Sequence, residues 1–271
     1  MKRIYNYLIF KFNSTKCTVF FIIITIYQFS IFIELISKNT KYNVYDLIMR
    51  NFEYLSVFYC INLFFLVMLY NLYEKKNFYN YLNLRFRTKQ EVYNANVIFV
   101  FVFSIIIVAF MNFVCVLQCI NNISFNNYWS PYFYQTMTGQ VNLMYTEDII
   151  RIITLKLSPF SYVMYSNLLI VLYLSFISMI FVVSNIIFKK RAVSFILVII
   201  LNAISMILEI VNSPISKLSF AKNIFFITAS RSEINNGTFI ILRIVYWVLL
   251  ITITYFIGNL LTKKIDYNYG E

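Results

Sequence analysis

Histidine is absent from the 271 residues of this chain, and glycine is rare. Without histidine the chain has no Ser-His-Asp or Cys-His catalytic arrangement, no HExxH site and few of the common zinc centres. The four glycines stand at positions 139, 237, 258 and 270, too far apart for the glycine-rich loop that holds the phosphates of ATP. The sequence therefore predicts a protein that does not hydrolyse ATP by itself and that binds no metal or cofactor.

Cysteine is scarce as well. The four cysteines, Cys17, Cys60, Cys115 and Cys119, all lie in or beside long apolar runs. Cys115 and Cys119 are one helical turn apart, a spacing compatible with a metal site or a redox pair. Buried cysteine more often behaves as a small hydrophobic residue. A membrane-embedded enzyme that used Cys60 or Cys115 as its nucleophile would lack a histidine base.

Charged residues make up only 13% of the chain, whereas hydrophobic residues make up 61% and the mean hydropathy is +0.72. Six apolar runs reach the length of about 20 residues that a helix needs to cross a bilayer. They fall at residues 17–37, 52–73, 96–119, 161–188, 192–211 and 239–261. The sequence therefore predicts an all-α polytopic membrane protein with six transmembrane helices.

The basic residues predict the orientation. With the N-terminus inside, the inner segments hold fourteen basic and four acidic residues, and the outer segments hold nine basic and seven acidic residues. Because basic residues favour the cytoplasmic side, both termini are predicted to be cytoplasmic. The excess would attract anionic membrane lipid, and its division among four short segments argues against nucleic-acid binding. The long first run without a small-residue cleavage site is typical of a retained anchor.

The N-terminal segment, residues 1–16, has its own pattern. Ile4, Leu8 and Phe12 recur every four residues, with basic residues beside them. This spacing predicts an amphipathic helix lying at the inner surface of the membrane.

Two outer segments are also distinct. Residues 120–160 are predicted to form an extracellular loop with an aromatic cluster and a short amphipathic helix at 148–157, which Pro159 ends. Residues 212–238 contain the mostly apolar stretch 220–229, which is too short to cross. This pattern predicts a re-entrant or interfacial segment between the fifth and sixth helices.

The connection at residues 73–97 is a basic, aromatic-rich polar island between two apolar runs. Phe78, Leu82 and Phe86 recur every four residues, which favours a short amphipathic helix, although residues 82–87 also alternate as a strand does. Thr88-Lys89-Gln90-Glu91 matches a capping box, so the third long helix is predicted to begin near residue 89. Such an island is expected to dock on a partner. The alternative is a basic helix lying against lipid headgroups.

Ionisable residues stand at the outer ends of three apolar runs: Glu34, Glu53 and Glu209, with Arg243 placed where it could pair with Glu209. One interpretation is a wetted outer rim. The other is an outward-opening cavity that contacts a polar or cationic cargo. Glu34, Glu209 and Arg243 are therefore candidates for the translocation path or outer gate. Asn62, inside the second run, is a fourth candidate, with interhelical hydrogen bonding as its alternative role.

In its arrangement the whole chain resembles the permease subunits of ABC transporters of the type 2 (ABC-2) exporter class. The resemblance lies in the start KRIYNYLIFKF, the six spans with both ends inside, the cytoplasmic connection NFYNYLNLRFRTKQEVYNANV, the basic reversal FKKRAVSF and the apolar stretch before the last span. It implies one transmembrane permease domain over residues 1–271, in a bacterial cytoplasmic membrane.

The resemblance also implies partners. In that family the connection between spans two and three carries a coupling helix that inserts into a groove of a cytoplasmic ABC ATPase. The residues expected to make this contact are Phe78, Tyr81, Leu82, Arg85, Phe86 and Arg87. ATP and Mg would bind the ATPase rather than this chain, which would dimerise with itself or with a sister permease.

An amphipathic peptide, such as a bacteriocin or toxin, is the cargo that the resemblance and the aromatic, apolar composition favour. Lipid-linked or polysaccharide cargo is the alternative within the same class. An ion-coupled secondary transporter is the alternative outside it. Such a transporter normally has midplane ionisable groups or helices broken by glycine and proline, and the runs here are almost free of both.

Overall fold

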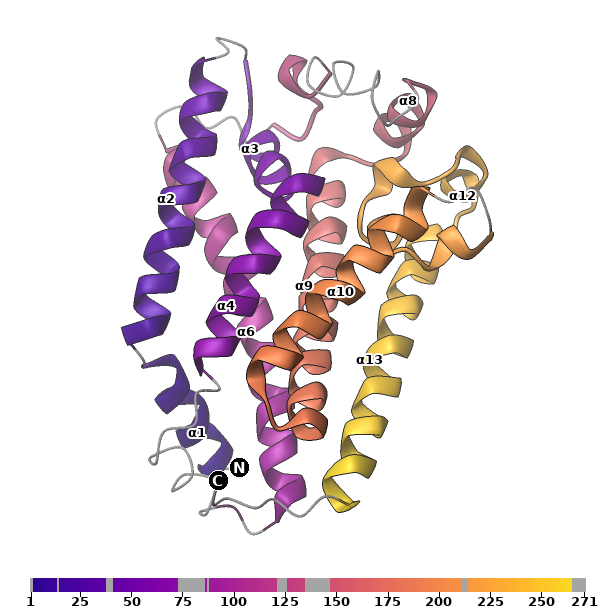
Figure 1. Ribbon diagram of the computed structural model, residues 1–271. Coiled ribbons are helices and arrows are strands. Elements are labelled where there is room, and N and C mark those ends of the chain that lie inside the picture. Colours follow the sequence, from indigo (N-terminus) through magenta and orange to yellow (C-terminus); the bar gives the residue numbers. More distant parts are fainter. Residues whose placement is uncertain are drawn as a thin grey trace.

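The computed structural model describes residues 2–13, 15–37, 41–72, 86, 88–120, 126–134, 147–210 and 214–264. Within these ranges the regular structure is entirely helical, without strands. The long helices form a bundle, with α1 and the last turn of α13 at one end and the short helices α8 and α12 at the other (Figure 1). The predicted all-helical class is confirmed for the part of the chain that the structure describes.

Among the described residues, five helices are long and apolar enough to cross a membrane. They are α2 (Thr15–Ser37), α6 (Lys89–Gln118), α9 (Pro159–Phe188), α10 (Arg191–Ile210) and α13 (Phe239–Lys264). At 1.5 Å per residue, even the 20 residues of α10 reach about 30 Å. Each of the five matches a predicted apolar run.

The second predicted span is a broken element. It consists of α3 (Val44–Asn51), the π-helical turn η1 (Ser56–Ile61) and α4 (Asn62–Leu72). Val44–Asn51 and Ser56–Asn71 are apolar enough to cross together and are bent by 55° at the break between them. By length and composition, the described part of the chain therefore has five helices that could span a membrane, or six if this bent pair is one span.

Helix α3 is an element that the hydropathy pattern did not predict, because the predicted span begins at residue 52, within the break. Asn43 and Asp46 form a capping box at its start. The Asn43 side chain accepts from the Asp46 backbone N–H at 3.0 Å, and the Asp46 carboxylate accepts from the Asn43 N–H at 2.7 Å. These bonds satisfy donors that a helix start leaves without intrahelical partners.

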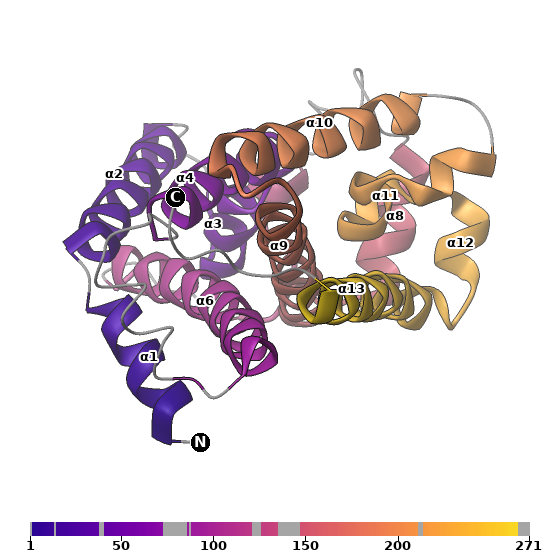
Figure 2. The same cartoon turned by 60° about the horizontal axis from the view of Figure 1, so that its bottom comes forward.

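Helix α9 is the centre of the bundle. It packs against α6, α10 and α13, which Figure 2 shows around it. In the most apolar 18-residue stretch of each helix, 78% of the residues are buried in α9, against 28% in α2, 22% in α10 and 17% in α13. The surface of those outer helices is apolar, with Ile33 at 65% and Phe256 at 57% exposure. An exposed apolar surface of this extent is consistent with a multi-pass membrane protein whose outer helices contact lipid.

Helix α1 (Lys2–Phe12) confirms the helix predicted near the N-terminus. Ile4, Leu8 and Phe12, the predicted apolar face, are partly buried against the core. Its position on the inner surface of a membrane stays a prediction.

The predicted helix at 148–157 is α8 (Glu147–Lys156), and Pro159 begins α9 instead of only ending α8. Between α10 and α13 the chain forms short pieces: η2 (Pro214–Leu218), α11 (Phe220–Ile224), η3 (Phe226–Thr228) and α12 (Arg231–Asn235). Each is too short to cross a membrane, as the sequence predicted for this region.

Candidate functional site

Helix α13 holds the short pieces η2 and α11 in place through three side chains on one of its faces. Arg243 donates to the Phe225 carbonyl at 2.8 Å, Tyr246 to the Leu218 carbonyl at 2.8 Å and Trp247 to the Asn223 carbonyl at 3.1 Å. The last carbonyls of a helix lack intrahelical partners, and leaving them unpaired at membrane depth costs several kcal/mol each. We call η2, α11 and η3 together (residues 214–228) the pinned segment.

Arg243 is 5% exposed, and its guanidinium lies 5.3 Å from the Phe226 ring and 5.0 Å from the Phe239 ring. The sequence raised an ion pair between Arg243 and Glu209. Among the contacts of the described residues, Arg243 uses the Phe225 carbonyl instead, and Glu209 accepts from the Tyr54 hydroxyl at 2.9 Å. Arg243 therefore anchors backbone, and Glu209 connects α10 to the break in the second span.

Glu34 and Glu53 share one guanidinium. Arg50 at the end of α3 donates to both carboxylate oxygens of Glu34 on α2, at 3.0 and 3.3 Å, and pairs with Glu53 in the break. One guanidinium nitrogen, Nη2, makes both contacts with Glu34, and the other, Nη1, bonds to Glu53, so the two carboxylates are held by different N–H groups of one side chain. The cluster ties α2 to the point where the second span bends.

Aromatic rings join the break to the pinned segment. The Phe225 ring lies 5.6 Å from Tyr54 and 6.0 Å from Phe58. Phe58 lies 5.6 Å from Tyr173 of α9, which in turn lies 5.6 Å from Trp247. Tilted and edge-on ring pairs at these separations add about 0.5–1.5 kcal/mol each beyond their buried area. The sequence could not predict this cluster, since its members come from four separate elements.

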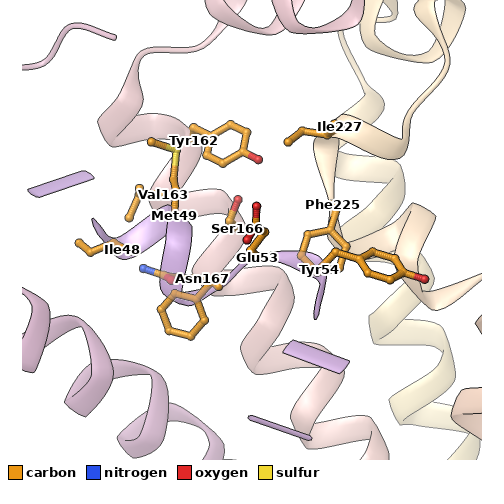
Figure 3. A pocket seen from close by; sticks show the side chains of 11 residues that line it. Ile48, Met49, Glu53, Tyr54, Tyr162, Val163, Ser166, Asn167, Phe225 and Ile227 are labelled. Atoms are coloured by element: carbon orange, nitrogen blue, oxygen red, sulfur yellow. The ribbon is translucent and has the colours of Figure 1, made fainter. Parts of the chain in front are cut away.

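A cavity of about 40 Å³ lies between these elements. Its lining comes from α3 and the break, from the first turns of α9 and from the pinned segment (Figure 3). The lining residues are Ile48, Met49, Phe52, Glu53, Tyr54, Tyr162, Val163, Ser166, Asn167, Phe225 and Ile227. Of the predicted acidic residues, only Glu53 lines it. Glu34 and Glu209 lie outside the lining: Glu209 bonds to Tyr54, which lines the cavity, whereas Glu34 bonds to Arg50, which does not.

Asn62 begins α4 and is 4% exposed. Its side-chain oxygen is buried and has no hydrogen-bond partner among the described residues. It does not line the cavity beside Glu53.

At the opposite end of the bundle, α6 begins at Lys89 as predicted, with the Thr88 hydroxyl accepting from the Glu91 N–H at 3.1 Å. Of the predicted coupling residues, Phe86 lies among the described residues. Its ring packs edge-on against Tyr7 of α1 at 5.8 Å, and the Tyr7 hydroxyl donates to Asn96 at 2.5 Å. Phe78, Tyr81, Leu82, Arg85 and Arg87 lie outside the described residues.

Hydrogen bonds hold the start of α6 against the last turns of α13. Gln90 donates to Asn259 at 2.7 Å, Tyr255 donates to Asn94 at 3.1 Å, and Tyr93 donates to the Tyr255 carbonyl at 3.1 Å. The Tyr93 ring lies directly on Gly258, where a Cβ atom would overlap its hydroxyl and ring carbons. Because only glycine leaves room for the Tyr93 ring, Gly258 has a packing role, although glycine is rare in this chain.

Lys11 is an unexpected buried cation. It is 1% exposed, with its ammonium 5.2 Å from the rings of Tyr7 and of Phe99 on α6. Burial lowers the pKa of Lys11 from 10.5 to about 7, and the nearby Cys17 thiol opposes that shift. The sequence pattern places Lys11 beside the apolar face of this helix and among the inner basic residues, and it did not predict that the ammonium is buried.

Cys115 has a hydrogen-bonding role between helices. Gln28 of α2 and Asn51 of α3 both donate to its sulfur at 3.4 Å. Gln28 also donates to the Met111 carbonyl of α6 at 2.9 Å. All four cysteines are free thiols. The amides thus bind α2 and α3 to α6 inside the apolar core.

Comparison with known proteins adds one relative. The chain is 25% identical over 249 residues to an uncharacterized protein of Halalkalibacterium halodurans, covering 91% of this chain and 87% of that protein. No family model matches the chain. No solved structure matches it.

Proposed function

We propose that this chain is the transmembrane permease subunit of an ATP-driven exporter of the ABC-2 class, in a bacterial cytoplasmic membrane. Its cargo is an amphipathic peptide, such as a bacteriocin or toxin. The proposal is supported by the sequence resemblance, by the number of apolar helices and by α1 lying at the same end of the bundle as the last turn of α13 (Figure 1). In this proposal both termini and residues 73–97 face the cytoplasm.

The observation that carries the proposal is the set of contacts made by α13 at its two ends. Near its last turns, Tyr255 and Asn259 bond to α6. Helix α6 begins just after residues 78–87, which contain the predicted coupling residues and are called the coupling segment below. Near its first turns, Arg243 and Trp247 hold the pinned segment. A push on the coupling segment would therefore move α6 and α13 together and displace the pinned segment beside the cavity.

The motor for this push is a separate subunit. Two ABC ATPases, each with bound ATP and Mg, would close on one another and drive the coupling segments of two permease chains. Phe78, Tyr81 and Leu82 would supply apolar contacts, and Arg85 and Arg87 would reach acidic rims of the ATPase groove. Phe86 packs on Tyr7, so in this proposal it connects the coupling segment to α1.

The proposal predicts that an ABC ATPase is encoded beside this gene, and co-expression with that ATPase tests it. The full chain is expected to co-purify with that ATPase in a two-to-two complex and to raise its ATP turnover. Leu82→Asp should leave the permease folded and abolish the complex, because it places a carboxylate in an apolar contact.

A matched control is Leu249→Asn, which alters a residue of α13 that is 56% exposed and does not belong to the predicted coupling residues. It should keep the complex. If the wild-type chain binds no ATPase, or if Leu82→Asp and the control behave alike, the exporter assignment is wrong.

One observation favours a lipid as second cargo candidate. An apolar groove of about 390 Å³ runs between α6, α9 and α13, lined by Val97, Ile98, Phe101, Val102, Met179, Ile251, Thr252, Tyr255 and Phe256. A groove of this lining fits an acyl chain better than a charged peptide. Transport of a labelled lipid that is blocked by Phe101→Trp, with peptide export unchanged, would favour this alternative.

A further inference from the structure

The last turn of α4 meets basic side chains from two neighbouring helices. Lys16 of α2 donates to the Asn71 carbonyl at 3.5 Å, and Arg191 of α10 donates to the Tyr70 carbonyl at 3.1 Å. Both helices pack against α4, and Figure 2 shows α4 between them. The last carbonyls of a helix have no intrahelical partners and together carry about half a negative charge. The two bonds therefore satisfy the end of α4 and show that the three helices reach this end of the bundle at one level.

Arg191 is held in a fixed orientation. Its guanidinium lies 4.9 Å from the centre of the Tyr70 ring, and that ring packs edge-on against Phe195 at 6.0 Å. Within the described part of the chain, the Tyr70 carbonyl is its one hydrogen-bond acceptor, and Nη1 makes that bond. A guanidinium has several N–H donors in one plane. Donors of this oriented group therefore remain for an acceptor outside the chain.

Two further cations precede Arg191 in the turn between α9 and α10. Lys189 ends α9 in the left-handed conformation, with a φ of 54°, and its N–H donates to the Asn185 carbonyl at 3.1 Å. Glycine is the residue favoured at such a position, because a Cβ makes this conformation costly. Lys189 and Lys190 are exposed, and neither side chain forms a hydrogen bond or ion pair with the described residues. The turn thus sets three consecutive basic residues beside the end of α4, one of them at a conformational cost.

The charge of these three residues, which we call the basic turn, is not neutralised within the described part of the chain. None of the three forms an ion pair with a described residue. The described carboxylates lie at the other end of the bundle, except for Glu91 in the first turn of α6. Figure 1 shows that the start of α6 lies beyond the ends of α4 and α9. Because three like charges in one turn repel one another, an anion bound at the basic turn would stabilise this end of the chain.

Apolar surface begins directly beside the basic turn. The exposed side chains nearest to it are Val193, Ile196 and Ile200 of α10 and Val67 and Leu63 of α4. Ile200 lies nine residues beyond Arg191, which corresponds to about 14 Å along the helix axis. The hydrocarbon core of one leaflet is about 15 Å thick. The exposed apolar surface therefore runs from the basic turn through about one leaflet.

We propose that the basic turn binds the phosphate of an anionic phospholipid whose acyl chains lie along α10 and α4. The phosphate matches the planar N–H donors of Arg191, and Lys189 and Lys190 add charge without a counter-ion. The acyl chains match the apolar surface that starts at the same level. A soluble phosphate would use the charge and leave that apolar surface uncovered. The inference requires only a chain that spans a bilayer, and it is independent of the exporter assignment and of the orientation.

Native mass spectrometry of the full chain in detergent tests the site. The probes are phosphatidylglycerol, which is anionic, and phosphatidylcholine with the same acyl chains, which has no net charge. Phosphatidylglycerol is expected to bind about tenfold more tightly and to raise the unfolding temperature. Lys189→Gln combined with Lys190→Gln should remove most of this preference and leave the binding of phosphatidylcholine unchanged. Both side chains are exposed, so the double variant is expected to fold.

The matched control removes two charges at the same end of the bundle. Arg3→Gln combined with Lys263→Gln alters exposed residues of α1 and α13 and should keep the preference for phosphatidylglycerol. Equal losses in the two double variants would show only a general attraction between opposite charges and would overturn the site. Unchanged phosphatidylglycerol binding in the variant of the basic turn would overturn it as well.

Lys189→Gly separates lipid binding from stability. Glycine adopts the left-handed conformation at lower cost, so the unfolding temperature without lipid should rise. The affinity for phosphatidylglycerol should nevertheless fall, because one charge of the basic turn is lost. A stabilised variant that binds this lipid as tightly as the wild type would contradict the proposal.

Two additional arms identify the occupant. Inorganic phosphate and glycerol 3-phosphate should not displace phosphatidylglycerol, because neither carries acyl chains, and displacement by either would assign the basic turn to a soluble anion instead. If Lys189→Gln with Lys190→Gln keeps the lipid but loses an ATPase that the wild-type chain recruits, the basic turn is a protein contact and the lipid proposal is overturned. Selective phosphatidylglycerol binding in a chain that recruits no ATPase would support the lipid site even though the exporter assignment had failed.

Discussion

Gly258 shows how a single missing side chain lets two helices meet. The Tyr93 ring fills the place that a Cβ would take, and its hydroxyl bonds to the Tyr255 carbonyl one turn earlier on α13. Inserting atoms into a packed contact usually costs 1–3 kcal/mol. The clamp between α6 and α13 therefore depends on this position.

Gly258→Ala is expected to destabilise the chain by about 1–3 kcal/mol, because the new methyl overlaps Tyr93. Unfolding in mixed detergent micelles measures the change. Gly237→Ala is the control, since nothing lies within 4 Å of a Cβ added there, and it should be neutral. Combining Gly258→Ala with Tyr93→Val should recover part of the loss, and an equal effect of the two alanines would contradict this account.

Lys11 makes stability depend on pH. Its pKa is about 7 in the folded chain and 10.5 when exposed, so between these values the unfolded chain binds more protons than the folded chain. The free energy of unfolding should therefore rise as the pH increases from about 7 to about 10.5, and the penalty of burying the ammonium is fully present below pH 7.

Lys11→Met should remove this rise and stabilise the chain below pH 7, because it keeps the packing against Tyr7 and Phe99 without a charge. Unfolding temperatures at several pH values between 6 and 10 provide the measurement. Lys263→Met, at an exposed position of α13, should leave the pH dependence as it is. A parallel pH profile for Lys11→Met and wild type would contradict the assignment.

At the scale of elements, donors from α13 add to the hydrogen bonds that the pinned segment makes within itself, such as Phe225 N–H to the Ala221 carbonyl. Arg243→Met should leave the Phe225 carbonyl with the Thr228 hydroxyl as its donor and remove the link to α13, together with the cation beside the Phe226 and Phe239 rings. We expect hydrogen exchange to increase at least tenfold across residues 220–228, with α9 unchanged. Tyr246→Phe, which loses one bond at an exposed site, should have a smaller effect. A uniform increase along the chain would indicate global destabilisation instead.

The long helices and the start of α6 could be predicted from the sequence. The start of α6 follows from Thr88 and Glu91, and the long helices follow from apolar runs whose length matches a bilayer. Helix α3 was missed because its polar residues depress hydropathy, although Asn43 and Asp46 carry a capping signal. The partners of Arg243 and Glu209 were not predictable, because their choice between an ion pair and other acceptors depends on how α10, α13 and the pinned segment pack.

At the scale of the whole molecule, the exporter proposal requires a fixed orientation. Ser232→Cys on the exposed surface of α12 should react with a membrane-impermeant maleimide in intact cells, and Lys263→Cys should react only after the cells are opened. Both are made with Cys17, Cys60, Cys115 and Cys119 replaced by alanine. The reverse labelling pattern would place the termini outside.

The contacts of α13 also predict that α6 and α13 move as one body. Cysteines replacing Gln90 and Asn259, whose longer side chains meet at 2.7 Å, should be joined by a short bis-methanethiosulfonate reagent in the same cysteine-free background. The cross-linked chain is expected to keep its stimulation of ATP turnover. Loss of stimulation that returns on reduction would show that the two helices must separate during the cycle.

The two tryptophans of the chain give this molecule a built-in optical probe. Trp129 bonds to the Leu157 carbonyl and lies 5.7 Å from Tyr162 at the cavity, and Trp247 lies 5.5 Å from Phe220 in the pinned segment. Tryptophan emission therefore reports on that half of the bundle, provided that the excitation is selective for tryptophan and excludes the tyrosines of α1 and of the start of α6. A change driven by nucleotide binding that reaches the pinned segment would alter the tryptophan emission. A change confined to α1 and the start of α6 would leave the emission constant.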